Sequence, residues 1–175
     1  IQEIIPQKRQ NLLFSATFPE KVEKLSEEFL LFPVKIEITR QATAVETVDQ
    51  YLYESPNFLS KLELLFYLLE KDVEEFERVI IFVRTKTMAD NVGKFLQRKA
   101  TGEVRTIHSN KGQNSRINAM NDFGAGEVRV LVSTDVVARG IDIPDVSHVI
   151  NFSVPRDYDD YVHRIGRTGR AGAVG

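Results

Sequence analysis

Residues 79–83 read Val-Ile-Ile-Phe-Val, with charged residues on either side. A short run without a polar residue is typical of a strand buried on both faces of a parallel sheet. The same reasoning predicts further strands over 104–107, 128–132 and 146–152, with helices over 87–96 and 113–123 between them. Strands and helices therefore alternate roughly every 20 to 25 residues, which predicts an α/β fold: a parallel sheet sandwiched by helices.

The segment before this core predicts one more strand and helix. Residues 49–54 have strand-like composition, and Ser55-Pro56 forms an N-cap followed by proline at the first helical position. The helix after them presents one apolar face, made of Leu59, Leu62, Leu65, Phe66 and Leu69. The acidic run from Asp72 to Glu77 is interpreted as the end of this helix and a loop.

The first 47 residues form a different pattern. An apolar run over 11–14 is followed by a helix from about Pro19 and by a strand over 34–38. Residues 39–47 are polar and without period, which is typical of a linker. We therefore expect three parts: residues 1–38, a linker over 39–47, and a domain over 48–175.

Composition limits the classes of protein to which the chain can belong. Its 175 residues carry 23 Lys plus Arg and 25 Asp plus Glu, for a net charge of −2, and 42% are apolar. These values indicate a folded domain. The longest apolar stretch, Phe29 to Val34, is too short to span a bilayer, and there is no recognisable secretion signal. The absence of Cys excludes thiolate metal sites and favours a reducing, cytoplasmic setting. No metal site is predicted.

Charge is distributed unevenly along the chain. Residues 1–40 are neutral, residues 41–77 carry a net −7, and residues 78–175 carry a net +5. Eleven of the fifteen basic residues in the last block are Arg, the side chain best suited to bidentate phosphate contacts. The net charge of −2 argues against binding a polyanion through bulk basicity. A solvated surface of mixed charge remains the alternative interpretation of the basic block.

Polar residues follow the predicted strands, where open parallel sheets bind their ligands. They are Thr85-Lys86, the His108–Gly112 loop, Ser133-Thr134-Asp135 and the run His163–Arg170. In that run three arginines recur every three residues between glycines, which leaves the backbone open to a polyanion. An arginine supplied by a second domain can accelerate phosphoryl transfer by about 10³ to 10⁵. From spacing alone, a flexible basic tail is the alternative.

Four ordered motifs resemble those of the DEAD-box RNA helicases of superfamily 2. They are Ser15-Ala16-Thr17, Gln113 with Arg116, Ser133–Asp135 with Ala138–Asp142, and His163–Arg170. The resemblance covers nearly the whole chain and is strongest with bacterial members of the RhlE type, because of the sequence of the loop His108–Arg116. It implies a RecA-like fold, related to the P-loop NTPases but without a phosphate loop of its own.

The resemblance also implies a nucleotide site for ATP with Mg²⁺. Arg164 and Arg167 match arginines that reach the γ-phosphate when two RecA-like domains close, whereas Arg170 is expected to be structural. Asp142, with Gly140, matches the contact to the ATP ribose. The residues matching those that couple nucleotide state to domain closure are His163 and the triplet containing Ser15 and Thr17.

On the RNA side the resemblance implies contacts to the phosphate backbone. Thr134 and Arg116 match positions that touch RNA phosphates, and Thr85, Lys86 and Gly112 are further candidates. Gln113 is expected to order the loop. Such contacts would bind RNA with little sequence preference. Ser109 and Val137 depart from the family pattern, and we expect only local repacking there.

Two family motifs are missing from the sequence. It has no Gly-x-x-x-x-Gly-Lys-Ser/Thr phosphate loop and no Asp-Glu-Ala-Asp tetrapeptide to hold Mg²⁺. We therefore expect a carboxyl-terminal helicase domain, truncated at its end, that follows the tail of an amino-terminal domain. Alone it should not hydrolyse ATP, and residues 1–38 should dock on a neighbouring surface or on another copy. A DNA-directed superfamily 2 helicase domain and a non-catalytic RNA-binding or interaction module are the alternatives.

Overall fold

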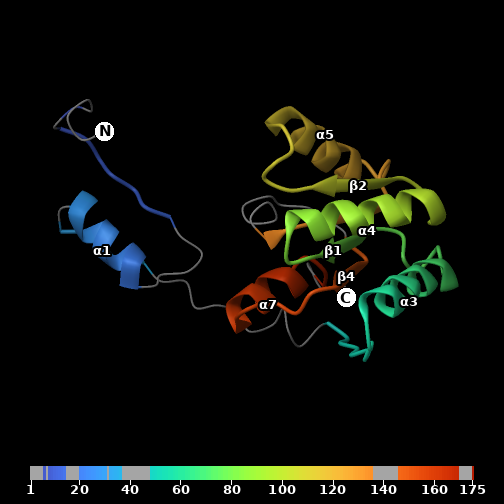
Figure 1. Cartoon of the computed structure of the whole chain (residues 1–175). Coiled ribbons are helices and arrows are strands. Elements are labelled where there is room, and N and C mark those ends of the chain that lie inside the picture. Colours follow the sequence, from blue (N-terminus) through green and yellow to red (C-terminus); the bar gives the residue numbers. More distant parts are fainter. Residues whose placement is uncertain are drawn as a thin grey trace. The chain divides into compact units, whose positions relative to one another are not determined.

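The computed structural model describes residues 6, 8–14, 20–30, 32–36, 48–135, 146–169 and 175. The chain divides into two compact units, Ile1–Arg40 and Gln41–Gly175. The second unit contains a parallel sheet with helices packed around it (Figure 1). No helix in the described ranges is long and apolar enough to cross a membrane.

The sheet has four described strands in the order β2-β3-β1-β4, and all of its pairings are parallel. The strands are β1 (Val79–Phe82), β2 (Val104–Ile107), β3 (Val130–Ser133) and β4 (His148–Asn151). Phe82 lies opposite Ser133 and Asn151, and Ser133 lies opposite Ile107. The carboxyl ends of all four strands therefore meet at one edge, as the alternating pattern predicts.

Each strand of the sheet serves two hydrophobic cores, because successive side chains point to opposite faces. Val79, Ile81 and Val83 pack with residues of α3 (Phe58–Lys71) and α4 (Lys86–Lys99). Ile80 and Phe82 pack on the other face with residues of α5 (Gln113–Gly124). This explains why residues 79–83 contain no polar side chain, and it confirms the predicted layers.

Two helices begin at residues other than those the sequence suggested. The N-cap of α4 is Thr85, whose Oγ1 accepts the Met88 amide at 3.1 Å, so the helix starts before the predicted box over 87–90. The N-cap of α3 is Asn57, which accepts the Ser60 amide at 2.9 Å, and not Ser55. In both cases the true cap is the residue whose side-chain oxygen reaches an amide three residues ahead.

Two of the predicted strands do not form among the described residues. Residues 49–54 are not part of the described sheet, and the Asp49 amide donates instead to the Gly175 carbonyl at 2.8 Å. Residues 34–36 of the predicted strand over 34–38 are also irregular. A strand needs a ladder of backbone hydrogen bonds with a neighbour, which strand-like composition alone does not supply.

The first unit contains α1 (Glu20–Phe29), as the helical spacing predicts. Apolar side chains are prominent on its surface: Phe14 is 87% exposed and Phe32 is 98% exposed. Asn11 donates to the Phe29 carbonyl at 3.1 Å and so ties the segment before α1 to its last turn. The unit thus exposes large apolar groups that a folded protein usually covers.

A buried arginine fixes the amino end of β3. Arg129 donates to the Phe76 carbonyl at 2.9 Å, to the Thr101 carbonyl at 2.8 Å, and to the Leu69 carbonyl. It also pairs with Glu70 at 3.2 Å. Burial alone would raise the pKa of Glu70, but hydrogen bonds from Thr101 and Arg129 outweigh burial and lower that pKa. These bonds hold α3, β3 and two loops together at the edge of the sheet opposite the carboxyl ends of the strands.

Candidate nucleic-acid and nucleotide interface

A polar surface lies beside the carboxyl ends of β1 and β2. Thr85 and Lys86 are exposed at the start of α4, and Gly112 is exposed at the start of α5. The Lys86 ammonium donates to Asn110 Oδ1 at 2.7 Å, which joins α4 to the loop before α5. Three of the predicted RNA contacts therefore lie on neighbouring elements, because both helices begin at the same edge. We call Thr85, Lys86, Gly112 and Arg116 the strand-end surface.

The His108–Gly112 loop is ordered from beneath by a buried histidine. His108 Nε2 lies 3.1 Å from Asp90 Oδ1, and its Nδ1 accepts the Asn110 amide at 3.3 Å. This bond pattern fits the neutral ring with its proton on Nε2. Lys111 reaches the same Asp90 oxygen at 3.0 Å. Hydrogen bonds from His108 and Lys111 lower the pKa of Asp90, so it stays ionised and fixes the loop.

Arg116 occupies the first turn of α5 and is half-buried. Its Nη1 donates to Gln113 Oε1 at 3.0 Å, a contact within the first turn of the helix. Its Nε is buried and has no hydrogen-bond partner within the described part of the chain. A buried donor without an acceptor is costly, whereas the other guanidinium nitrogens can still form charge-assisted bonds to an anionic oxygen.

Thr134 differs from the other predicted RNA contacts because it is only 7% exposed. It follows the last residue of β3, and its carbonyl accepts the Ser133 hydroxyl at 3.0 Å. Thr134 therefore lies at the edge where the carboxyl ends of the strands meet. Its burial means that its position depends closely on what holds the end of β3.

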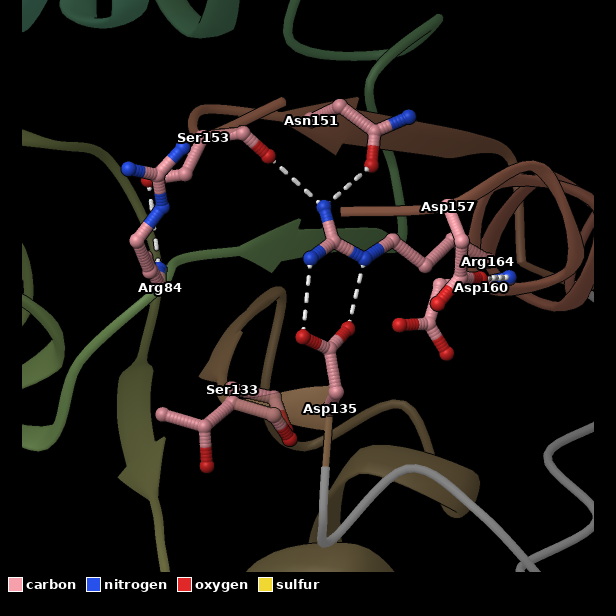
Figure 2. Close-up of polar contacts among 9 residues, drawn as sticks. Arg84, Ser133, Asp135, Asn151, Ser153, Asp157, Asp160 and Arg164 are labelled. Carbon is pink, nitrogen blue, oxygen red and sulfur yellow. Dashed lines mark hydrogen bonds and ion pairs between the residues drawn. The ribbon is translucent and has the colours of Figure 1, made fainter. Parts of the chain in front are cut away.

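Arg164, in α7 (Tyr158–Ile165), is held inside the domain by four hydrogen bonds. Nε and Nη2 donate to the two carboxylate oxygens of Asp135 at 2.6 and 2.9 Å. Nη1 donates to Asn151 Oδ1 at 2.9 Å and to the Ser153 carbonyl at 2.7 Å. Figure 2 shows the guanidinium between Asp135 on one side and Asn151 and Ser153 on the other. The Phe82 ring centroid lies 5.1 Å from the guanidinium carbon.

This placement departs from the expectation that Arg164 reaches a phosphate. The residue is only 4% exposed, and each of its three side-chain nitrogens already donates within the domain. The sequence motif identifies an arginine here but does not say which acceptors surround it. The geometry makes Arg164 a link between α7 and the ends of β3 and β4.

His163 and Arg167 lie on either side of this link and are both half-buried. His163 Nδ1 is buried and has no hydrogen-bond partner in the described ranges. The Arg167 amide donates to the Arg164 carbonyl at 3.1 Å, one of the backbone bonds that close the end of α7. Asp157 begins the same helix by accepting the Asp160 amide at 2.8 Å. The start of α7 is therefore acidic, with Asp157 as its N-cap.

Several predicted site residues lie outside the described residues. They are Ser15, Ala16 and Thr17, the Ala138–Asp142 segment with Gly140 and Asp142, and Arg170. The other candidates lie just after carboxyl strand ends, in the first turn of α5, or in and just after α7. No group of three or more His, Asp or Glu side chains that could hold a metal ion occurs in the described residues.

Comparison with known families identifies the domain that carries these residues. The family described as "helicase conserved C-terminal domain" matches residues 60–172, well over half of the chain. The chain belongs to this family. The helicase C-terminal domain therefore includes the sheet, the strand-end surface and the Arg164 link.

Individual relatives of this helicase C-terminal domain are DEAD-box proteins. The DEAD-box ATP-dependent RNA helicase CshA of Geobacillus kaustophilus is 39% identical over 171 residues, which cover 98% of this chain and 36% of the relative. Dbp5 of S. cerevisiae, bound to RNA and ADP BeF3, matches with a TM-score of 0.80 and 32% identity over 99% of this chain and 45% of that one. The domain is thus a DEAD-box carboxyl-terminal domain with the RecA-like fold.

A third match is a single domain bound to nucleic acid. Domain 2 of the DEAD-box helicase Mss116p, bound to an RNA duplex, matches with a TM-score of 0.57 and 31% identity, over 65% of this chain and 45% of that one. The chain spans only 36% of the length of the CshA relative.

Sequence reasoning missed several residues that shape the site of this helicase C-terminal domain. Asp90, Asn110 and Lys111 order the loop, and Asn151 and Ser153 hold Arg164. One signal was available in advance: Asp90 follows Lys86 by four residues, so the two share a helix face near the N-terminus of α4. The acceptors of Arg164 come from segments far apart in the sequence, and no local spacing could have identified them.

Proposed function

We propose that the chain is the carboxyl-terminal half of an ATP-dependent RNA helicase. The relatives named as DEAD-box RNA helicases, and the match of 99% of this chain to an RNA-bound and nucleotide-bound Dbp5, support this assignment. In the complete protein, binding of ATP and RNA closes two RecA-like domains around the nucleotide. The closed state then strains a short RNA duplex.

The strand-end surface is the proposed RNA contact. The observation that carries this proposal is the 2.7 Å bond from Lys86 to Asn110, which brings the start of α4 beside the loop that leads to α5, where Arg116 lies in the first turn. A phosphate oxygen at the start of α5 would meet the helix N-terminus and the guanidinium of Arg116. Exposed Thr85, Lys86 and Gly112 extend the surface along the phosphate backbone, and Thr134 lies at the same edge.

The carboxyl end of α7 is the proposed nucleotide side. Arg167 is the arginine that we assign to the γ-phosphate, because every side-chain nitrogen of Arg164 already donates a hydrogen bond within the domain. Asp142 and Gly140 remain our candidates for the ribose. His163, Ser15 and Thr17 remain our candidates for coupling nucleotide state to domain closure. When bound, ATP supplies the phosphoryl group whose transfer to water drives the cycle.

An amino-terminal helicase domain completes the proposed enzyme. We propose that it supplies the phosphate loop and the Mg²⁺ ligands, so that the present chain alone does not hydrolyse ATP. Residues 1–38 would be the tail of that domain, 39–47 the linker, and 48–175 the second domain. The large exposed apolar groups Phe14 and Phe32 support docking of residues 1–38 on a neighbouring surface or a second copy. An RhlE-type member acting in the cytoplasm is the more specific form of the proposal.

RNA binding by the chain itself provides the test. The variants are Arg116→Ala and, as a control with the same loss of charge, Arg98→Ala. Arg98 lies in the last turn of the 14-residue helix α4, roughly 20 Å along the helix from Thr85. With a fluorescent RNA duplex and no nucleotide, we expect Arg116→Ala to weaken binding about tenfold, as the loss of a charge-assisted hydrogen bond predicts. Arg98→Ala should bind within about twofold of the unmodified chain.

The competing functions give different results in the same assay. Tighter binding to a DNA duplex of equal sequence than to RNA would favour a DNA-directed helicase. Equal losses in Arg116→Ala and Arg98→Ala would mean that binding depends on overall charge, and the strand-end surface would then be wrong.

A further inference from the structure

We propose that Arg164 is a positioning residue that couples the RNA side of the domain to the nucleotide side. It touches neither ligand. It fixes α7, which precedes Arg167, to the end of β3, which carries Thr134. The inference rests on the proposed function for the identity of the two sides, and it assigns to Arg164 a role different from that of a phosphate contact.

The geometry joins three elements through one side chain. Arg164 comes from α7, Asp135 follows β3, and Asn151 ends β4 (Figure 2). The Asp135 carboxylate receives two parallel bonds of 2.6 and 2.9 Å, an arrangement that fixes the direction of both groups as well as their distance. The Asn151 amide and the Ser153 carbonyl hold the far side of the guanidinium. A displacement of α7 must therefore carry the end of β3 with it.

The neighbours of this ion pair are the residues proposed for function. Thr134 immediately precedes Asp135, and His163 and Arg167 lie one residue before and three residues after Arg164. Thr134 is 7% exposed, so a phosphate can reach it only if the end of β3 is held in the right place. A misplacement of about 1 Å is enough to cost a large share of a directed contact.

A second buried arginine separates this role from simple stabilisation. Arg129 stands just before β3, donates to the Leu69, Phe76 and Thr101 carbonyls, and pairs with Glu70. It is nearly as deeply enclosed as Arg164 but lies at the opposite end of the same strand, beside none of the proposed ligand contacts. Lysine at either position keeps the charge and loses the planar fork. Arg129→Lys is therefore the matched control.

The test measures RNA affinity of the chain without nucleotide, at a temperature where circular dichroism shows every variant folded. We expect Arg164→Lys to bind an RNA duplex about tenfold more weakly, the size expected when one directed contact to phosphate is lost. Arg129→Lys should lower Tm by a similar amount and leave RNA affinity within about twofold. Asp135→Asn should reproduce Arg164→Lys, and the double variant should be no weaker than either single variant, because both remove the same link.

An independent readout uses the backbone amide signals of Thr134 and His163 in a nitrogen-15 spectrum. Both signals should move in Arg164→Lys and stay in place in Arg129→Lys. Unmoved signals, or equal losses of RNA affinity in the two lysine variants, would overturn the positioning role. If the unmodified chain fails to bind RNA, the proposed function fails instead, and the amide signals still decide whether Arg164 links the two sides.

Discussion

Thr85 combines a structural and a proposed functional role, and substitutions can separate them. Its hydroxyl oxygen caps α4 by accepting the Met88 amide at 3.1 Å, and the residue is exposed on the strand-end surface. Thr85→Ala removes the cap and should lower the free energy of unfolding by about 1 kcal/mol. Thr85→Asp keeps a capping oxygen and places a negative charge at a helix N-terminus, where it stabilises by about 0.5 kcal/mol. Its stability should therefore equal or exceed that of the unmodified chain.

RNA binding should follow a different order. The carboxylate introduced by Thr85→Asp would face the phosphates with a negative charge. This variant should therefore bind RNA at least about tenfold more weakly at low salt, and the loss should shrink as salt is raised. Thr85→Ala loses only the hydroxyl contact and should bind between the unmodified chain and Thr85→Asp. Thr85→Ser keeps both the cap and the hydroxyl and is the control.

Urea unfolding and fluorescence anisotropy at two salt concentrations measure the two orders on the same samples. The expected stability order places Thr85→Ala last, whereas the expected RNA order places Thr85→Asp last. Two results would refute the reasoning: RNA affinity that falls in proportion to stability across the series, or a Thr85→Asp variant that binds RNA as tightly as the unmodified chain.

Two further predictions concern packing and pH. A Cβ on Gly93 would lie 2.0 Å from Thr106 Oγ1, so Gly93→Ala should lower the free energy of unfolding by roughly 1 to 3 kcal/mol in urea unfolding. In a Thr106→Ala background the same change should raise it by about 1 kcal/mol, because alanine favours the helix. A loss of stability in both backgrounds would contradict this. His148 stacks on Phe76 with ring centroids 3.9 Å apart, and burial lowers its pKa below 6.5 although Glu75 opposes the shift. The stability due to neutral His148 is therefore present above pH 6.5 and is lost as pH falls through the lowered pKa. His148→Phe should lose less stability between about pH 8 and about pH 5 than the unmodified chain, and an equal loss in urea unfolding at the two pH values would contradict this.

The layers of the fold were predictable because they depend on a local property. Val79 to Val83 is apolar at every position, and a strand in contact with helices on both faces requires this. Helix starts were less predictable, since Thr85 and Thr87 are equally good caps by type and only the backbone decides between them. Residues 49–54 failed as a strand because strand formation depends on a neighbour that composition does not reveal.

The site divides in the same way. Thr85, Lys86 and Gly112 were predictable from topology, because parallel strands bring their carboxyl ends together whatever side chains they carry. The role of Arg164 was not predictable, since it depends on Asp135, Asn151 and Ser153, which come together only in the folded chain. Sequence spacing identifies where an arginine stands but not whether its donors are already used.

This distinction changes what the net charge of −2 implies about a polyanion partner. The basic block over 78–175 carries eleven arginines, yet Arg129 and Arg164 are buried and bonded to protein carbonyls and carboxylates. Lys111 is likewise held by Asp90, which stays ionised because hydrogen bonds from His108 and Lys111 lower its pKa. Asp90 and Asp135 thus pair with Lys111 and Arg164, and these pairs fix the loop and the end of β3. A nearly neutral chain can then favour a phosphate backbone through the positions of Lys86 and Arg116, because Lys86 bonds to Asn110 of the loop that Asp90 and Lys111 fix.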